Sequence, residues 1–299
     1  MGKKVLAIYY SQSGQLGEII DQLCAPLTHA GVEVERLQIR LKDEPPFPWT
    51  SKSFFGVMPD CVLGVTAELA PFAFRETRYD LILLGYQAWF LSPSIPFNSL
   101  MHHPLMKEIV KDTPVVTVTG ARNMWVNAFE GVKKLLKGAG ARHVGTIALV
   151  DRHLNLVSIF TIFHWMLGGK KDRWLGVFPR PGVADEDIAK AGSFGSTLLS
   201  CLEKNEWEGM QDTLTAQKAV DLKYHLMLME SKAGILFGLW ARWISSRKKK
   251  GPWLVAFKYY LLLALFLFAP IVYLIDLVLF KPFLSRYVKA KKESCLRLN

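Results

Sequence analysis

The sequence feature that most constrains the fold is a strand, a polar loop and a helix within residues 5–27. Residues 5–10 are an apolar and aromatic run, which is typical of a strand buried on both faces. Residues 11–14, Ser-Gln-Ser-Gly, interrupt this run, and apolar residues then return with helical spacing. Such a loop directs backbone N–H groups and two hydroxyls toward the positive end of a helix, so it predicts an anion site, usually for phosphate. The alternative is an ordinary turn with a helix N-cap.

Four further apolar segments predict strands, and the intervening segments predict helices. Strands are expected at 32–39, 79–85, 115–119 and 144–150, and helices at 60–70, 99–111, 128–137 and 184–202. The polar positions of the 32–39 segment place it near an edge of the sheet. Five strands alternating with helices predict an α/β fold with a doubly wound parallel sheet. Ligands bind such sheets beyond the carboxyl ends of the strands, so the loops 11–16, 86–92 and 120–125 should converge on one site.

The first of these loops resembles the phosphate loop of the flavodoxin-like family, commonly Ser/Thr-x-Ser/Thr-Gly-x-Ser/Thr. Residues 11–15 fit the pattern, and Leu16 stands where a hydroxyl is common. The resemblance covers residues 1–205 and implies a five-stranded sheet of order 2-1-3-4-5 that binds FMN. It implies cofactor contacts from all three loops: Ser11, Gln12, Ser13, Gly14, Gln15, Leu16, Tyr86, Gln87, Ala88, Trp89, Phe90, Gly120, Ala121, Arg122, Asn123 and Trp125.

Three aromatic residues in these loops are candidates for stacking on the flavin ring. They are Tyr86, Trp89 and Trp125, which by position follow the third and fourth expected strands. For each of them, packing in the protein core is the alternative.

A narrower resemblance extends over nearly the whole chain. Residues 5–16, Pro-Phe-Pro-Trp at 46–49, and the segments 54–55, 58–59 and 62–64 are similar to the dialkylresorcinol condensing enzymes. These accompany a ketosynthase and an acyl carrier protein in bacterial pathways to dialkylresorcinols and aryl polyene–type lipids. No cysteine of this chain lies in a thiolase-type context, as carbon–carbon condensation would require. We therefore expect a flavin-dependent oxidation that aromatises a dialkylcyclohexane-1,3-dione to a dialkylresorcinol, with hydride passing to the flavin.

Aromatisation also needs a base for an acidic C–H proton and donors for the enolate. Arg122 and Asn123 are the best-placed donors by loop position, and His102 and His103 are candidate bases. Adjacent helical residues point about 100° apart, so at most one of the two histidines would face the site. The alternative for either is an ordinary surface histidine.

Two insertions interrupt the expected FMN domain. Residues 41–78 are rich in proline and aromatic residues and are expected to form an irregular loop, either covering an apolar site or packing on the core. Residues 153–176 contain an apolar run, 154–167, that is too short to span a bilayer. Basic residues follow this run, so we expect an interfacial segment, with a core helix as the alternative.

Hydrophobicity and charge predict that the C-terminal region, residues 206–299, is helical and membrane-associated. Hydrophobic residues make up 51% of the 299 residues, and the net charge is +11. Much of the excess of hydrophobic residues and much of the excess positive charge lie near the C-terminus. The segment 259–280 is long enough to span a bilayer, and basic residues flank it on both sides. Pro270 would kink it, and Asp276 is its one ionisable residue. A single span and a re-entrant hairpin both remain open, and we favour the hairpin.

The cysteine spacing, the absence of nucleic-acid motifs and the N-terminal segment limit which cellular compartment and which partners are expected. The cysteines form no CxxC pair, so no metal site is expected, and no nucleic-acid motif accompanies the basic charge. The first strand starts almost at Met1, so no secretory leader is expected. We place the protein at the cytoplasmic face of the inner membrane, with membrane lipid and a lipophilic small molecule as partners. A homodimer stays open.

Three functions remain after the sequence analysis. The first is the membrane-bound aromatase. The second is a membrane-bound NAD(P)H:quinone-type reductase, which would use the same fold and FMN, with NAD(P)H as a second cofactor and hydride flowing the other way. The third is a non-catalytic scaffold that docks the ketosynthase and acyl carrier protein to the membrane.

Overall fold

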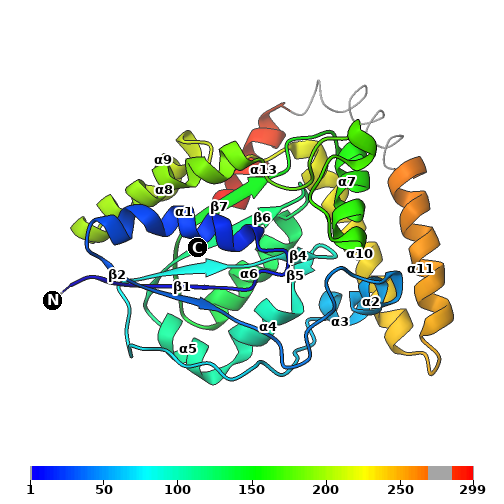
Figure 1. Ribbon diagram of the computed structural model, residues 1–299, viewed down its shortest axis with the longest axis horizontal. Coiled ribbons are helices and arrows are strands. Elements are labelled where there is room, and N and C mark those ends of the chain that lie inside the picture. Colours follow the sequence, from blue (N-terminus) through cyan, green and yellow to red (C-terminus); the bar gives the residue numbers. More distant parts are fainter. Residues whose placement is uncertain (1, 269–284, 299) are drawn as a thin grey trace.

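The computed structural model describes residues 2–268 and 285–298, and it contains a five-stranded parallel sheet (Figure 1). The strand order is β2-β1-β3-β6-β7, which counts as 2-1-3-4-5 among the strands of this sheet. This is the order of the flavodoxin-like doubly wound fold, so the predicted fold class is confirmed. The edge position predicted for the second strand is also correct. The strands are β1 (Lys4–Tyr9), β2 (Glu33–Gln38), β3 (Leu81–Gly85), β6 (Pro114–Ala121) and β7 (Arg142–Val150).

Helices cover both faces of the sheet (Figure 1). One face carries α1 (Gln15–His29), α8 (Asp185–Lys204) and α9 (Met210–Ala216). The other carries α4 (Ile95–His102), α5 (Pro104–Val110) and α6 (Val126–Gly138).

Each face of the sheet has its own hydrophobic core, and successive residues of β1 alternate between the two. Val5 and Ala7 belong to the core under α1 and α8, whereas Leu6 and Ile8 belong to the core under α4 and α6. Side chains alternate across a strand, so burial on both faces requires every position to be apolar. This explains the continuous apolar run from which the first strand was predicted.

Several local predictions were wrong in detail. The helix expected at 60–70 lies earlier, as α2 (Ser51–Gly56) and α3 (Met58–Val62), because Thr50 and Ser53 form a capping box that starts α2. The single helix expected at 99–111 is split into α4 and α5 by Pro104, which holds the preceding His103 in an extended conformation. The loop after β3 contains a small hairpin, formed by β4 (Ala88–Trp89) and β5 (Ser92–Pro93).

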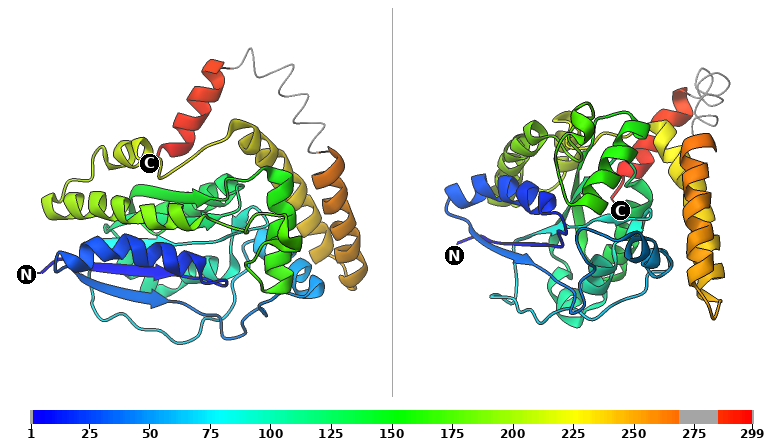
Figure 2. Two further views of the ribbon diagram at one scale, coloured as in Figure 1. Left: turned by 45° about the horizontal axis from the view of Figure 1, so that its top comes forward. Right: turned by 45° about the vertical axis from the view of Figure 1, so that its right-hand side comes forward.

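A group of helices lies at the carboxyl end of the sheet (Figures 1 and 2). These are α7 (Asn155–Gly168), α10 (Tyr224–Ser245) and α11 (Gly251–Leu263), together with the short π-helix η2 (Ala264–Phe268). Helix α10 packs against α3 and α6. The short η1 (Trp174–Gly176) follows α7, and α13 (Ser285–Leu296) ends the described chain, where Lys133 of α6 donates to the backbone carbonyl of Cys295.

The predicted membrane segment is only partly described. Residues 259–268 belong to α11 and η2, whereas residues 269–280, with Pro270 and Asp276, lie outside the described residues. Among the helices of the described part, none is both long and apolar enough to cross a bilayer. The division of the chain at residue 205 stays a prediction.

The close packing of α1 against α8 generates a test of the fold. A Cβ added at Gly195 would lie 2.3 Å from the backbone oxygen of Leu23, whereas one added at Gly192 would lie 3.8 Å from that of Gln22. We expect Gly195→Ala to destabilise the fold by about 1–3 kcal/mol, because backbone cannot yield as a flexible side chain can. Gly192→Ala, the control on the same helix, should raise the free energy of unfolding by up to about 1 kcal/mol, because alanine has the higher helix propensity. Urea unfolding measures both, and equal effects would contradict the packing.

Candidate active site

A cavity of about 510 Å³ lies at the carboxyl end of the sheet. Its floor comes from the loops after β1, β3 and β6, and its walls come from α2, α7, α10 and α11. The three predicted loops therefore converge as expected. The predicted cofactor-binding residues that line this cavity are Gln12, Ser13, Gln15, Leu16, Gln87, Ala88, Trp89, Phe90, Gly120, Ala121 and Arg122.

The hydroxyls of the first loop are not used to cap the helix that follows. The N-cap of α1 is Gly14, at φ 86°, and no side chain bonds the first turn there. The Ser11 Oγ is buried without a hydrogen-bond partner in the described structure, and Ser13 lines the cavity. The first N–H groups of an α-helix also lack intrahelical acceptors. The ordinary turn with a side-chain N-cap therefore does not account for this loop, whereas an anion would satisfy both sets of donors.

Two glutamines of this loop are held by neighbouring segments. Gln15 both donates to and accepts from the backbone of Val183, at 3.1 and 3.0 Å, which fixes the segment before α8 over the start of α1. The Nε1–H of Trp49 donates to Oε1 of Gln12 at 2.8 Å, whereas Nε2 of Gln12 is buried without a partner in the described structure. The predicted insertion at 41–78 therefore does cover the site, through Trp49.

Leu16, at the position where the family pattern commonly has a hydroxyl, is a core residue. Its side chain is 1% exposed and packs with the cluster that joins α1 to the sheet. A hydroxyl at this position would exchange apolar packing for one polar contact. Leu16 therefore contributes to the stability of the fold while one edge of it faces the cavity.

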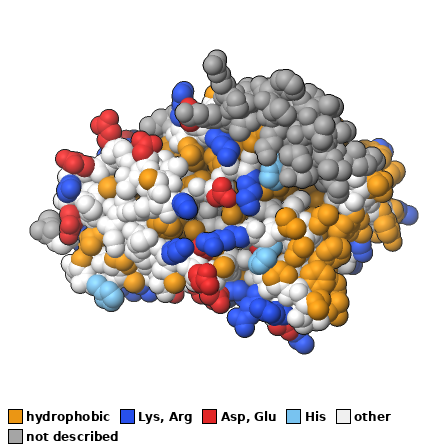
Figure 3. Space-filling view, turned by 90° about the horizontal axis from the view of Figure 1, so that it is seen from above, with side chains coloured by type: hydrophobic (Ala, Val, Ile, Leu, Met, Phe, Trp, Pro, Cys, Tyr) orange, Lys and Arg blue, Asp and Glu red, His pale blue; other side chains and the backbone are white. Residues whose placement is uncertain are grey.

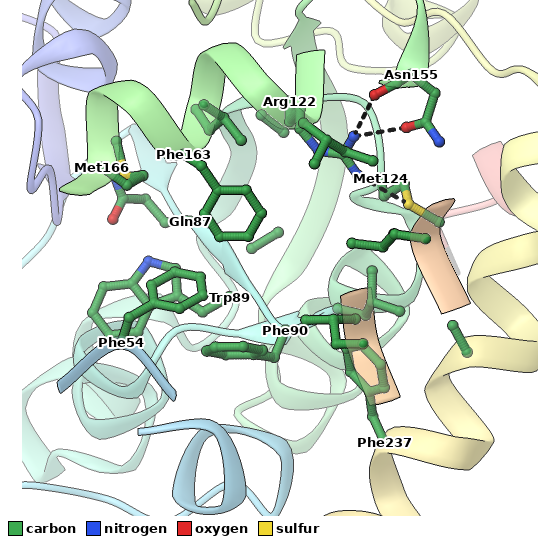
Figure 4. Close-up of a pocket in the computed structure, with 18 of the residues that line it drawn as sticks. Phe54, Gln87, Trp89, Phe90, Arg122, Met124, Asn155, Phe163, Met166 and Phe237 are labelled. Atoms are coloured by element: carbon green, nitrogen blue, oxygen red, sulfur yellow. Dashed lines mark hydrogen bonds between the residues drawn. The ribbon is translucent and has the colours of Figure 1, made fainter. Parts of the chain in front are cut away.

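The β4–β5 hairpin presents aromatic side chains to the cavity (Figure 4). Its turn residues Phe90 and Leu91 have φ of 48° and 61°, a left-handed conformation that costs non-glycine residues energy. The turn places the Phe90 ring 5.0 Å from that of Phe54, and the Trp89 ring lies 5.5 Å from that of Trp49. Among the stacking candidates, Trp89 is therefore the one that lines the cavity.

Arg122 is the main polar group of the loop after β6 (Figure 4). Its guanidinium donates to the backbone oxygen and Oδ1 of Asn155, at 3.3 and 2.7 Å, and contacts Sδ of Met124 at 3.3 Å. Burial lowers its pKa to about 10, partly opposed by the charges of Asp151 and Glu230. The side chain is thus oriented by α7 and stays cationic at neutral pH.

Five predicted cofactor residues do not line the cavity. Ser11 and Gly14 belong to its first loop without forming its wall. Tyr86 and Trp125 are fully buried, with their rings 5.7 Å from Phe97 and 5.4 Å from Phe129, so the core-packing alternative is correct for both. Asn123 lines a separate small pocket with Trp125.

The two candidate bases, His102 and His103, also lie away from the cavity. Helix α4 begins beside the hairpin and carries both residues to its other end, about 12 Å further on. Nδ1 of His102 bonds the backbone oxygen of Asn98, and the His103 ring packs against Phe72 at 4.8 Å. In this geometry neither can reach a ligand in the cavity directly.

Residues of α7, α10 and α11 were missed as parts of the site. Ile162 and Phe163, Leu236 and Phe237, and Leu261 line the cavity. Their apolar character was visible in the sequence, but it was attributed to membrane contact. Helical spacing cannot distinguish a face turned to lipid from one turned to a cavity.

No protein-family model and no curated protein matches the chain. Solved structures do match in part. A flavoprotein in complex with FMN from Lactobacillus acidophilus NCFM is 19% identical over 49% of this chain and 93% of its own, with a TM-score of 0.40. Oxidised flavodoxin 1 from Bacillus cereus is 16% identical over 66% and 98%, with a TM-score of 0.36. A flavone reductase is 12% identical over 68% and 64%, also at 0.36. The assignment of the flavodoxin-like fold rests on the chain's own sheet order.

A buried carboxyl group, Glu230, joins α10 to the start of α6 and was not predicted. Its side chain is 1% exposed, and its Oε2 accepts from the backbone N–H of Asn127 at 3.0 Å, at the start of α6. Burial raises its pKa from 4.5 to about 8, against the lowering effects of the Asn127 and Val126 N–H groups and of Arg122.

This raised pKa predicts a stability that falls with increasing pH. Between about pH 4.5 and pH 8 the folded state holds a proton that the unfolded state has lost, so the free energy of unfolding decreases across that window. Glu230→Gln keeps an acceptor for Asn127 and should remove this contribution, whose slope is at most about 1.4 kcal/mol per pH unit. Urea unfolding at several pH values measures it, with the exposed Glu208→Gln as control. Equal slopes for wild type and Glu230→Gln would contradict the expectation.

Proposed function

We propose that the chain is an FMN-dependent oxidoreductase that acts on an apolar substrate in the cavity at the carboxyl end of the sheet. The observation that carries this proposal is the pairing of unused loop hydroxyls at the start of α1 with a large apolar cavity beside them. FMN combines a phosphate with an apolar ring, which matches that pairing. A scaffold would need neither feature, so a ligand-binding role is favoured.

The residues present fit FMN. The buried Ser11 Oγ and Gln12 Nε2 lack partners within the described structure, as does Gln87 Oε1, and all three belong to the expected loops. Ser11, Ser13 and the start of α1 would hold the phosphate, and Trp89 with the backbone of Gly120 and Ala121 would flank the ring. When bound, FMN would supply hydride transfer.

The substrate we propose is a dialkylcyclohexane-1,3-dione, which would be aromatised to a dialkylresorcinol. The apolar wall from α7, α10 and α11 suits its alkyl chains, and Arg122 would stabilise negative charge on its oxygen. These helices cover part of the site and would limit the access of water to the substrate. Since His102 and His103 lie outside the cavity, neither is proposed as the base.

We also propose that the protein docks on the cytoplasmic surface of the inner membrane. Exposed apolar side chains form stripes with a spacing of four residues: Ile235 and Leu239 on α10, and Val255, Tyr259 and Leu263 on α11. The turn between these helices carries the basic residues 247–250, and Arg247 lies over the rings of Trp243 and Trp253. Figure 3 shows apolar side chains gathered at this end of the molecule, close to lysines and arginines. An interfacial helix pair has this composition.

The cofactor assignment predicts FMN uptake that depends on Ser13. The protein purified in detergent should show flavin absorbance or gain it on titration with FMN. Ser13→Ala should weaken FMN binding about 10-fold, because a hydrogen bond to a charged phosphate is lost. The exposed Ser193→Ala is the control. Absence of FMN binding by the wild type would reject both enzymatic functions.

An activity assay separates the aromatase from the quinone-type reductase. Aerobic incubation of the FMN-loaded protein with a synthetic dialkylcyclohexane-1,3-dione should yield the dialkylresorcinol, detected by mass spectrometry. Formation of quinol from a quinone and NADPH, without any resorcinol from the dione, would instead establish the reductase.

Membrane docking predicts that the exposed stripes control vesicle binding. The triple variant Leu239→Ser, Val255→Ser and Leu263→Ser should lower binding to anionic vesicles at least 10-fold, because each apolar side chain contributes about 1.5 kcal/mol or more on burial. The control is Leu63→Ser, Val65→Ser and Leu105→Ser, three exposed apolar residues elsewhere. Co-sedimentation measures both, and equal binding by the two variants would contradict docking through α10 and α11.

A further inference from the structure

The charged groups of the cavity are all of one sign. Among the described residues that line the cavity, the side chains that are charged at neutral pH are Arg122 and Lys232, and none is a carboxylate. Lys232 lies on the face of α10 that also presents Met229, Ala233 and Leu236 to the cavity, at helical spacings of three and four. Two cations therefore face an otherwise mostly apolar space.

The carboxyl groups nearest to this charge compensate for it only in part: Asp151 and Glu230 raise the pKa of Arg122, but neither forms an ion pair with it in the described structure. Asp151 accepts hydrogen bonds from His153 and from Ser158, and Glu230 accepts one from the backbone of Asn127. In the described part of the chain neither Arg122 nor Lys232 makes an ion pair, and Arg122 bonds only neutral groups. A buried cation without an ion-pair partner is costly, so Arg122, with the exposed Lys232 at the same cavity, suits the site to an anionic ligand.

The FMN phosphate would not fill this role. It is expected at the loop after β1, whereas Arg122 follows β6, and β3 lies between these two strands. Two strand spacings put the two loops about 10 Å apart across the sheet. The anion that Arg122 and Lys232 would bind is therefore a different group from the FMN phosphate.

The cavity walls on the side of the helices are apolar. Helix α7 contributes Ile159, Ile162 and Phe163, and α11 with η2 contributes Leu261 and Leu265. The ring of Phe160 on the outside of α7 lies 5.1 Å from that of Phe266 in η2, so these two helices meet along an apolar seam. A ligand here would place a charged group beside the strand ends and a hydrocarbon chain between the helices.

We propose that the cavity selects an amphiphile with an anionic oxygen head, such as a carboxylate or an enolate, which Lys232 and Arg122 bind together. This inference deepens the proposed function, on which it rests for the role of the bound molecule as substrate. Lys232 is a specificity-determining residue: its ammonium contacts the head of the ligand, while the chain lies between α7 and α11. An acidic 1,3-dione bound as its enolate has this chemistry, whereas a neutral quinone does not.

The test is calorimetric binding of dodecanoate and of dodecanol to the FMN-treated protein. Wild type should bind dodecanoate at least 10-fold more tightly than dodecanol, since a hydrogen bond to a charged group contributes about 1.5–3 kcal/mol. Lys232→Met, which keeps length and loses charge, should weaken dodecanoate about 10-fold and leave dodecanol unchanged. Lys232→Arg should restore the preference. The control is Lys258→Met, because Lys258 bonds Ser51 on the exposed side of α11.

Each outcome decides the question. Equal affinities for dodecanoate and dodecanol in the wild type, or an unchanged preference in Lys232→Met, would overturn the proposal. Lys232 is exposed and makes no hydrogen bond or ion pair within the described residues, so its variant should fold, and FMN uptake by Lys232→Met provides the check. Failure of the wild type to bind FMN while it still prefers dodecanoate would reject the flavin function and retain the anionic-amphiphile site.

Discussion

Burial of the central sheet on both faces is the constraint on which the rest of the structure depends. Val5 and Ala7 of β1 enter one core, and Leu6 and Ile8 enter the other. With both faces occupied by apolar packing, polar groups that serve a ligand are restricted to the ends of the strands. The loops that follow β1, β3 and β6 therefore meet at one edge, although long stretches of sequence separate them.

The helices at that edge turn an open ligand site into a partly covered cavity. Without α7, α10 and α11, the three loops would face solvent, as the strand ends of a minimal doubly wound sheet do. These helices supply most of the apolar wall, and they also orient the polar groups: Asn155 of α7 holds Arg122, and Glu230 of α10 holds the start of α6. The same helices present apolar stripes outward, so the cavity and the proposed membrane surface are two faces of one layer.

The parts of the site that depend on chain order were predictable, and the parts that depend on side-chain direction were not. The strand order and the convergence of the loops follow from the alternation of apolar strands with helices. Tyr86 and Trp125 were expected in the cavity because of their loop positions, but both point into the core, where they pack on Phe97 and Phe129. His102 and His103 were expected near the ligand because they follow the third-strand loop, but α4 carries them to its opposite end.

The sequence by itself determined the sheet, its order and the edge at which a ligand would bind, because the period of apolar residues is a local property that each segment carries. It also determined that the Ser11–Gly14 loop starts a helix, though not how its hydroxyls are used. Only the tertiary structure decided that Gly14 is the N-cap of α1, which leaves the hydroxyls of Ser11 and Ser13 free. It also decided that Lys232 lines the same cavity as Arg122. These features depend on which helix face packs against which loop, and no local pattern encodes that choice.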